Sequence, residues 1–531
     1  LNFLLKEGRL TMATKTISTR KYKKQKLRNA EYYQMQEILD QLYEDSLQNK
    51  NFKNLYDLII SEENIKLAFR TIKNNKGSYT RGRNKTNIIN IKENEVGKVI
   101  KYVRNRLEDF RPHKVRRVFI PKPDGRLRPL GIPSIEDRLI QQCFKQILEP
   151  ICEAKFYKHS YGFRPNRSTK HAIARVHQLI NTSGMKYCVD IDLKSFFDNV
   201  NHGKLLKQIW SLGIRDKKVI SIISKMLKAE IEGEGIPTKG IPQGGILSPL
   251  LANIVLNEMD WWIASQWETF PINKEYANNY SRIRHLRENT KLKEIHLVRY
   301  ADDFKIFCKD YETASRINIA TRKWLKERLQ LEVNEEKSRI INLQKNYSNF
   351  LGIKLKVRNK KNRTVVTSHI AEKSQEHIKR IIKERAMTVH KTQNPADVIK
   401  LNATILGIHN YYNVATNISS DMNKINYQLE RFLNKVIGQS KERPIDKNNK
   451  VFQKFYGNYK GKIRYCNGKP IFPINYVKTC PPMNFNPEIN DYTEKGRQLI
   501  HAKLKGIDMK ILRHIMENPN PKYRMEYNDN R

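Results

Sequence analysis

Two adjacent acidic residues, Asp302 and Asp303, interrupt a run of apolar residues, and this feature constrains the fold most. Residues 297–309 read as two short strands joined by a tight turn at residues 301–303, so both carboxylates lie at the tip of a β-hairpin. Neighbouring carboxylates repel each other, which is costly unless cations lie beside them. Most Asp-Asp pairs are solvated turns, so a metal site here needs further carboxylates from neighbouring strands.

A second strand supplies such a carboxylate. Residues 185–192 alternate between apolar and polar side chains and end at Asp192, where a helix is expected to begin. Nucleotidyl transfer uses two divalent ions about 3.5–4 Å apart, which clamp the attacking 3′ oxygen and the leaving pyrophosphate. Two or three carboxylates from neighbouring strands form such a clamp, and hard oxygen ligands suit magnesium.

Two further segments suit a nucleotide. The glycines of residues 240–249, GIPQGGILSP, let the backbone approach a ligand closely, and Gln243 can hydrogen-bond a base or sugar edge. The alternative is a loop that simply leads into the next helix. Residues 115–130 read as a basic hairpin with a turn at residues 121–125. Its basic side chains suit a triphosphate, because Arg fits phosphate oxygens in a fork: Lys122, Arg126 and Arg128.

The overall charge indicates a polyanionic partner. The 531 residues include 100 Lys+Arg against 54 Asp+Glu, a formal net charge of +46. Such a surface repels itself and favours nucleic acid. No apolar run reaches the ~18 residues that span a bilayer, and the six scattered cysteines form no C-x-x-C pair. We therefore expect a cytoplasmic protein without a zinc site, a disulfide framework or a membrane partner. Codons for Glu7-Gly8-Arg9 can form a purine-rich ribosome-binding site just before Met12, so we expect a bacterial source and Met12 as the native start.

The remaining pattern is mostly helical, with three or four domains expected for this length. The expected elements are basic helices in residues 20–75, helices in 134–158, 201–229 and 311–330, a short strand in 350–355, helices without strands in 370–440, and a small irregular region rich in Asn, Pro, Tyr and Gly in 450–531.

An ordered set of motifs resembles the reverse transcriptases of group II introns. Each motif alone is modest, but together they cover nearly all of residues 30–460 in the order of the family. They read RRVFIPKPDGRLRPLGIP, HSYGFRPNRST, VDIDLKSFFDNV, GIPQGGILSPLLANI, VRYADDF, LEVNEEKS and FLGIKL. The resemblance implies an α+β right-hand polymerase, with fingers and an antiparallel palm sheet, followed by an α-helical thumb and a small C-terminal DNA-binding region.

The resemblance also implies four regions. Residues 1–75 would be a basic helical N-terminal extension, 76–368 the reverse transcriptase fingers and palm, 369–460 the thumb, also called maturase domain X, and 461–531 a DNA-binding region. Many relatives continue into a zinc-bearing HNH endonuclease, which we expect to be absent because Cys466 and Cys480 lack the spacing of its cysteine pairs. We expect that removing residues after about 460 leaves primer extension and splicing largely intact.

The resemblance assigns the metal site to Asp192, with the Leu193 carbonyl nearby, and to Asp302, assisted by Asp303. Two magnesium ions are the implied cofactor. Lys337 matches the lysine proposed to protonate the leaving pyrophosphate, and one more solvated lysine is an equally good interpretation. Asp190 and Asp198 are nearby carboxylates for which a structural role is the better interpretation.

The resemblance also implies contacts with the incoming nucleotide and the primer. Lys122 and Arg128, followed by Arg126, match triphosphate contacts, and Gln243 matches the glutamine beside the nucleotide. Phe197 matches the aromatic residue that stacks under the sugar and excludes a 2′-hydroxyl, and core packing beside Phe196 competes with that role. The primer-grip segment is matched by Phe350, Leu351 and Gly352. Tyr411 and Tyr412 could stack on RNA bases, although helix packing is the more common use of such a pair.

The implied function is an RNA-directed DNA polymerase that also binds its intron RNA to assist splicing and supports intron mobility by target-primed reverse transcription. Its partners would be the intron RNA, an RNA template with a DNA primer, target DNA and dNTPs. One alternative is a reverse transcriptase domesticated for phage defence, against which the intron-like ends of the chain argue. Another is a splicing-only RNA-binding maturase, against which the three retained aspartates argue.

Overall fold

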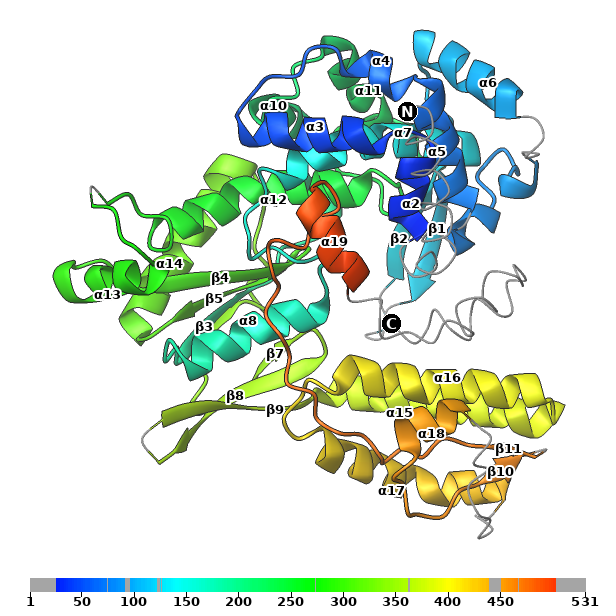
Figure 1. Cartoon of the computed structure of the whole chain (residues 1–531), viewed down its shortest axis with the longest axis vertical. Coiled ribbons are helices and arrows are strands. Elements are labelled where there is room, and N and C mark those ends of the chain that lie inside the picture. The colour runs from blue at the N-terminus through cyan, green and yellow to red at the C-terminus, as the bar shows by residue number, and fades with distance from the viewer. Residues whose placement is uncertain are drawn as a thin grey trace, which may run out of the picture.

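The structure is a computed structural model that describes residues 25–502 except 74, 91–95, 122–124, 126, 273, 362, 439–449 and 467. Lys122 and Arg126 therefore lie outside the described residues, as do Met12 and residues 503–531. Figure 1 shows a helical lobe at the top, a sheet with flanking helices in the middle and a helical bundle below. No helix in the described part of the chain is both long and apolar enough to cross a membrane.

The upper lobe is built from amphipathic helices around α7 (Ile135–Glu153). In α5, Ile65, Ala68 and Ile72 recur at helical spacing and are buried against this centre. The predicted helices of the N-terminal region are confirmed within the described residues. They are α2 (Gln25–Tyr32), α3 (Gln36–Leu47), α4 (Leu55–Ile59) and α5 (Glu62–Lys73). Short 3₁₀ turns at Lys76–Tyr79 and Ile88–Asn90 and a further helix that was not predicted, α6 (Val96–Glu108), follow.

The predicted basic hairpin extends from this lobe. Strands β1 (Arg116–Pro121) and β2 (Leu127–Ile132) pair antiparallel, with Arg116 opposite Ile132. Gly125 lies in the connecting turn at φ +82°, a conformation that glycine adopts without strain. Arg128 therefore projects from an exposed hairpin.

The central sheet is antiparallel, in the strand order β4-β5-β3-β6. Its strands are β3 (Tyr187–Ile191), β4 (Ile295–Tyr300), β5 (Asp303–Cys308) and β6 (Arg339–Asn342). Helices α8 (Thr169–Asn181), α12 (Ser248–Ser265) and α14 (Tyr311–Trp324) pack on it. Strands β4 and β5 are buried along almost their whole length. The predicted α+β fold with an antiparallel sheet is confirmed.

Further helical elements lie between the strands and helices named so far. They are α9 (Phe196–Asn199), α10 (His202–Ser211), α11 (Lys217–Leu227), α13 (Asn279–Asn289) and a π-helical turn at Leu325–Leu329.

The prediction of one strand over residues 350–355 is wrong at residues 351 and 352. These two residues form a turn between β7 (Ser348–Phe350) and β8 (Ile353–Lys360), with Leu351 at φ +51° and Gly352 at φ +77°. A leucine in the left-handed region is uncommon, so the apolar pattern masked the turn. A third strand, β9 (Arg363–Ile370), completes this second sheet in the order β7-β8-β9.

Three long helices form the bundle and confirm the prediction for residues 370–440 within the described part. They share an apolar interior that includes Ile382, Leu401 and Leu429. Their bounds are α15 (Glu372–Thr392), α16 (Pro395–Tyr412) and α17 (Ile418–Ile437).

The segment after the bundle returns to it. Ile463, Ile471 and Phe472 are buried in the same cluster as the bundle helices, and Asn402 of α16 donates to the Pro470 carbonyl. The premise that residues after about 460 leave the bundle untouched is therefore wrong. The elements of this segment are α18 (Lys450–Tyr456), β10 (Tyr465–Cys466), β11 (Lys469–Pro470) and α19 (Glu494–Ala502).

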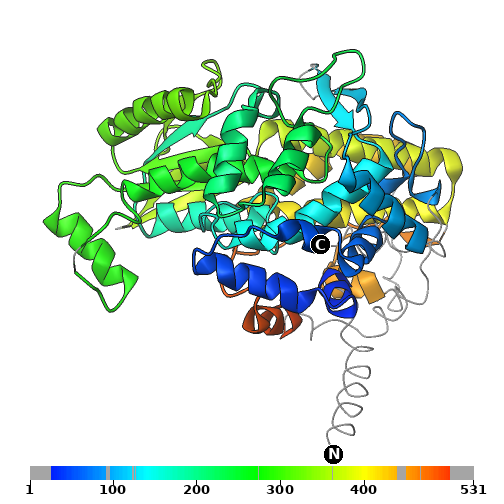
Figure 2. The ribbon, with the colours of Figure 1, turned by 90° about the horizontal axis from the view of Figure 1, so that it is seen from above.

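The chain then runs from the bundle back to the upper lobe, and both views place α19 beside α3 (Figure 1, Figure 2). Arg497 forms an ion pair with Asp40 of α3 at 2.7 Å. The buried Tyr492 donates to Glu149 of α7 at 3.3 Å and stacks on Tyr43. We call residues 478–497 the strap, because it contacts both the bundle and the lobe.

Candidate active site

The fold brings the three predicted aspartates to one edge of the central sheet. Asp192 directly follows β3, and Asp303 begins β5, with Asp302 in the two-residue turn after β4. Strands β3 and β5 are neighbours, with Ile191 opposite Phe304. A side chain after the end of β3 therefore lies beside the β4–β5 turn.

The electrostatics of this edge show mutual repulsion. Burial raises the pKa of Asp303 to about 6, and the charges of Asp190, Asp302 and Asp192 add to the rise against the opposing charge of Lys305. Removal from water also raises the pKa of Asp302, and the Asp192 carboxylate adds to it. Uncompensated carboxylates of this kind are stabilised by bound cations.

Lys337 is the cation nearest to Asp192. Its Nζ lies 3.6 Å from Asp192 Oδ2, and both side chains are half-exposed. The Asp192 amide donates to Ser338 Oγ at 3.0 Å, and the Asn334 amide donates to the Asp192 carbonyl at 2.8 Å, so the segment of Lys337 is fixed beside the aspartate. The sequence placed these residues 145 positions apart, and the fold makes them neighbours.

The residues present fit hard divalent cations by their chemistry, since all three are carboxylates with raised pKa values or a cationic neighbour. They do not form a closed cage. Within the described residues, no three His, Cys, Asp or Glu side chains converge closely enough to hold a metal ion.

The two other nearby carboxylates differ in their surroundings. Asp190 pairs with Lys305 Nζ at 2.7 Å, and Lys305 is fully buried. Asp198 is exposed in α9. The ion pair gives Asp190 a structural partner, as expected from the sequence.

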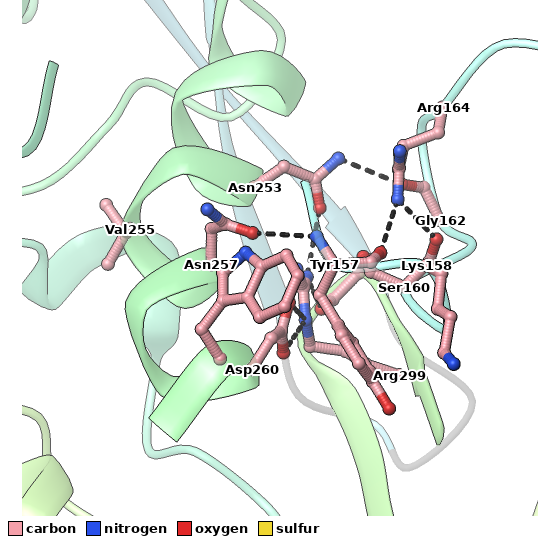
Figure 3. A network of polar contacts seen from close by, with 12 residues as sticks. Tyr157, Lys158, Ser160, Gly162, Arg164, Asn253, Val255, Asn257, Asp260 and Arg299 are labelled. Carbon is pink, nitrogen blue, oxygen red and sulfur yellow. Dashed lines mark hydrogen bonds and ion pairs between the residues drawn. The ribbon is translucent and has the colours of Figure 1, made fainter. Parts of the chain in front are cut away.

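A buried ion pair supports the Asp302 turn, and sequence reasoning missed it (Figure 3). Arg299 of β4 binds Asp260 of α12, with Nη2 at 2.5 Å from Oδ2, and both side chains are buried. Arg299 also donates to Asn253 Oδ1 at 2.9 Å and to the Ala301 carbonyl at 2.8 Å. The available signal was an arginine inside an apolar strand, which requires a partner when it is buried.

The second support of the turn is Gly162, in the HSYGFRPNRST motif. A Cβ at Gly162 would lie 2.2 Å from the Ala301 amide nitrogen, so only glycine fits against the turn. Asn253 donates to the Gly162 carbonyl at 2.9 Å (Figure 3). The Tyr161 amide donates to the Arg299 carbonyl at 2.9 Å. This motif therefore braces the turn.

The glycine-rich loop connects the aspartates to the basic hairpin. The Ile241 amide donates to the Phe197 carbonyl at 2.6 Å, and the Gly131 amide of β2 donates to the Gln243 carbonyl at 2.8 Å. A Cβ at Gly244 would lie 2.5 Å from the Gly131 carbonyl oxygen. Gln243 is thus held between α9 and the hairpin of Arg128, whose charge opposes the rise in the pKa of Asp302.

The structure leaves both interpretations of Phe197 open to experiment. Its ring is half-buried and meets the buried Phe196 edge-on, at 5.3 Å between centroids. Part of the ring packs on the core, and the rest is exposed.

The Phe350–Gly352 turn lies between the central sheet and the bundle. Phe350 is buried, with its ring centroid 5.5 Å from Lys305 Nζ, so only Leu351 and Gly352 reach the surface. Tyr411 of α16 donates to the Leu351 carbonyl at 3.2 Å. This contact favours the packing interpretation of Tyr411 and of its edge-on neighbour Tyr412.

Comparisons with known proteins decide the family. The family model described as reverse transcriptase (RNA-dependent DNA polymerase) matches residues 120–355, which contain all three aspartates. Protein YkfC of Escherichia coli K12 is 34% identical over 318 residues, covering 57% of this chain and 83% of YkfC. The group II intron-encoded protein LtrA of Lactococcus lactis subsp. cremoris is 28% identical over 522 residues, covering 85% of this chain and 86% of LtrA.

This chain belongs to the group II intron reverse transcriptase and maturase family. It also resembles the putative COX1/OXI3 intron 1 protein of Saccharomyces cerevisiae, at 27% identity over 64% of this chain and 43% of that protein. Membership makes the chain an RNA-directed DNA polymerase with a right-hand fold. The family acts on nucleic acids and uses divalent metal ions.

Proposed function

We propose that Asp192, Asp302 and Asp303 hold two magnesium ions for nucleotidyl transfer, with the Leu193 carbonyl beside them. The observation that carries this proposal is that Asp192 and the Asp302–Asp303 turn lie at the same sheet edge, with raised pKa values for the turn carboxylates. When bound, such ions activate the 3′ oxygen of the primer and neutralise the leaving pyrophosphate.

Other residues orient the nucleotide. Arg128 and, by resemblance, Lys122 and Arg126 bind the triphosphate, and Gln243 hydrogen-bonds the nucleotide from the loop beside that hairpin. Phe197 lies in α9, just after Asp192 in the chain, and excludes the 2′-hydroxyl of an incoming ribonucleotide. The Phe350–Gly352 turn holds the primer terminus through Leu351 and Gly352, since Phe350 is buried.

Lys337 is the general acid for the pyrophosphate. Its ammonium group lies 3.6 Å from the Asp192 carboxylate, so a proton donor stands beside the proposed metal site.

The second role is assistance to intron splicing. The bundle α15–α17 is the thumb, or domain X, within residues 369–460, and together with the N-terminal extension it holds intron RNA through phosphate contacts and shape. Residues 461–531 bind target DNA and support mobility by target-primed reverse transcription. The strong positive charge of the chain supports these roles.

The catalytic assignment is tested by primer extension on an RNA template with magnesium. Asp192→Asn and Asp302→Asn each remove one charge at nearly constant shape. We expect the rate of extension to fall at least about a hundredfold, because a bound metal ion stabilises the transition state by several kcal/mol and the amide binds it less well. RNA affinity should persist. The matched control is Asp198→Asn, which removes an exposed carboxylate from the neighbouring α9 and should extend normally. Near wild-type extension by either first variant would remove that residue from the active site.

A further inference from the structure

One face of β8 carries a row of basic side chains. Lys354, Lys356, Arg358 and Lys360 occupy alternate positions of the strand, whereas Ile353, Leu355 and Val357 between them are buried. Alternate residues of a strand point to the same face and lie about 7 Å apart. At the far end of the hairpin, Arg363 of β9 pairs with Lys360 and extends the basic row.

Little of this charge is neutralised by the protein. Lys354 forms an ion pair with Glu372 at the start of α15. In the part of the chain that the structure describes, no acidic side chain forms an ion pair with Lys356, Arg358 or Lys360. Fixed, uncompensated cations in a row attract a polyanion.

A cavity of about 470 Å³ opens beside this row. Tyr347 lies in its wall, with its ring centroid 5.5 Å from Lys356 Nζ, and His369 meets that ring edge-on at 6.0 Å. His369 is itself held by Asp421 at 2.9 Å. Amide side chains complete the lining and offer both donors and acceptors: Gln344, Asn359 and Asn417.

This face lies away from the aspartates. The Val357 amide of β8 donates to the Leu343 carbonyl, and the Leu343 amide donates to the Lys186 carbonyl, both at 2.8 Å. Lys186 precedes β3, and Asp192 follows it, so the outer half of β8 lies about 20 Å along the sheet from the carboxylates. Figure 1 shows the β8–β9 hairpin on the opposite side of the molecule from β1 and β2.

We propose that this β8 face, comprising Lys356, Arg358, Lys360 and Tyr347, binds an unpaired segment of structured RNA outside the polymerase cleft. The basic row contacts successive phosphates, and the cavity receives one unstacked base. RNA fits better than duplex DNA, because proteins recognise unpaired RNA through aromatic rings and hydrogen bonds to exposed base edges, and the cavity supplies both. A paired base cannot enter such a cavity.

The test uses full-length protein whose cleft is saturated with an unlabelled RNA template and DNA primer. The labelled probe is an RNA hairpin with a ten-nucleotide loop, compared with blunt RNA and DNA duplexes. One variant combines Lys356→Gln, Arg358→Gln and Lys360→Gln, and another carries Tyr347→Leu. The control combines Lys207→Gln, Lys217→Gln and Lys228→Gln, which removes three exposed charges from α10 and its neighbour α11.

The triple β8 variant should bind the RNA hairpin at least tenfold more weakly. The slope of log K against log salt concentration should be less steep by about 2, because three phosphate contacts are lost. Tyr347→Leu should lose roughly five- to hundredfold in affinity for the hairpin and little for the RNA duplex. Primer extension should be unchanged in both variants. Wild-type hairpin affinity in the triple variant, or a loss equal to that of the control, would overturn the proposal. An equal loss on blunt DNA would overturn its assignment to RNA.

Discussion

The chemistry of the sheet edge depends on residues that carry no charge of their own. Gly162 lies against the Ala301 backbone and sets how closely its motif approaches the Asp302 turn, whereas Gly244 lies against Gly131 and sets how closely the glycine-rich loop approaches the basic hairpin. The sequence predicted that Asp302 and Asp303 lie in a hairpin turn near Asp192, and the structure places them at one sheet edge, whereas their catalytic role stays a prediction. It did not predict the support beneath them, since a glycine reads as a loop signal whether or not anything packs on it.

Gly162→Ala tests this support at the scale of one methyl group. The added Cβ would lie 2.2 Å from the Ala301 amide nitrogen, so the Asp302 turn must shift. We expect primer extension to fall at least tenfold, because a displacement of about 1 Å can cost a hundredfold in rate. Gly97→Ala in α6 is the control, since nothing lies within 4 Å of its Cβ position, and it should extend normally. Normal extension by Gly162→Ala would show that the turn tolerates displacement.

Phe197→Ala separates sugar selection from core packing. If the ring lies under the incoming sugar, its loss makes room for a 2′-hydroxyl, and incorporation of ribonucleotides should rise relative to deoxyribonucleotides. Steady-state extension with each nucleotide gives the ratio. Phe196→Leu, a change in the fully buried neighbour, should lower stability without altering that ratio. An unchanged ratio in Phe197→Ala together with lower stability would assign Phe197 to the core.

At the scale of elements, alternation of apolar and polar residues and turn residues predicted both hairpins of the polymerase core. The absence of strand signals predicted the helices of the bundle. The failure at residues 350–355 has a physical cause. Leu351 adopts a left-handed conformation that its residue type does not signal, and Tyr411 holds it there through the Leu351 carbonyl. The packing of α12 against β4 was equally invisible, because the Arg299–Asp260 pair joins residues 39 positions apart.

Breaking that pair should destabilise the palm. Arg299→Met leaves the Asp260 carboxylate buried without its partner, which costs roughly 3–5 kcal/mol of unfolding free energy. Asp260→Leu added to Arg299→Met should recover much of this loss, because two apolar side chains then replace two buried charges. Urea denaturation gives the values. Arg284→Met breaks an exposed pair with Glu288 and should change stability by less than about 1 kcal/mol. A similarly small effect of Arg299→Met would contradict the account.

At the scale of the whole molecule, the C-terminal part is integrated into the fold. Composition suggested a small irregular region after residue 450, but Phe472 completes the bundle core, and Tyr492 is buried between α3 and α7. Such long-range returns have no local pattern in the sequence. Whether residues 461–531 bind DNA stays a prediction, and deletion after 460 cannot test it cleanly because that deletion also removes core residues.

The strap should therefore contribute to stability. Tyr492→Ala empties a buried aromatic site, and we expect it to lower the free energy of unfolding by about 3–5 kcal/mol. Met483→Ala changes the same segment at a side chain that is 80% exposed, and it should have little effect. Equal stability of the two variants in urea denaturation would mean that the strap is not tied to the lobe in solution.

The central claim is that one chain carries two separable functions, DNA synthesis on the palm aspartates and RNA binding on surfaces elsewhere. The most direct measurement is the activity of the Asp302→Ala/Asp303→Ala double variant in two assays, primer extension on an RNA template and splicing of the intron RNA at low magnesium. The account predicts that extension is lost and that splicing proceeds as with the wild type, because the bundle and the N-terminal helices are unchanged. Loss of splicing in a folded variant that still binds the RNA with normal affinity would contradict it.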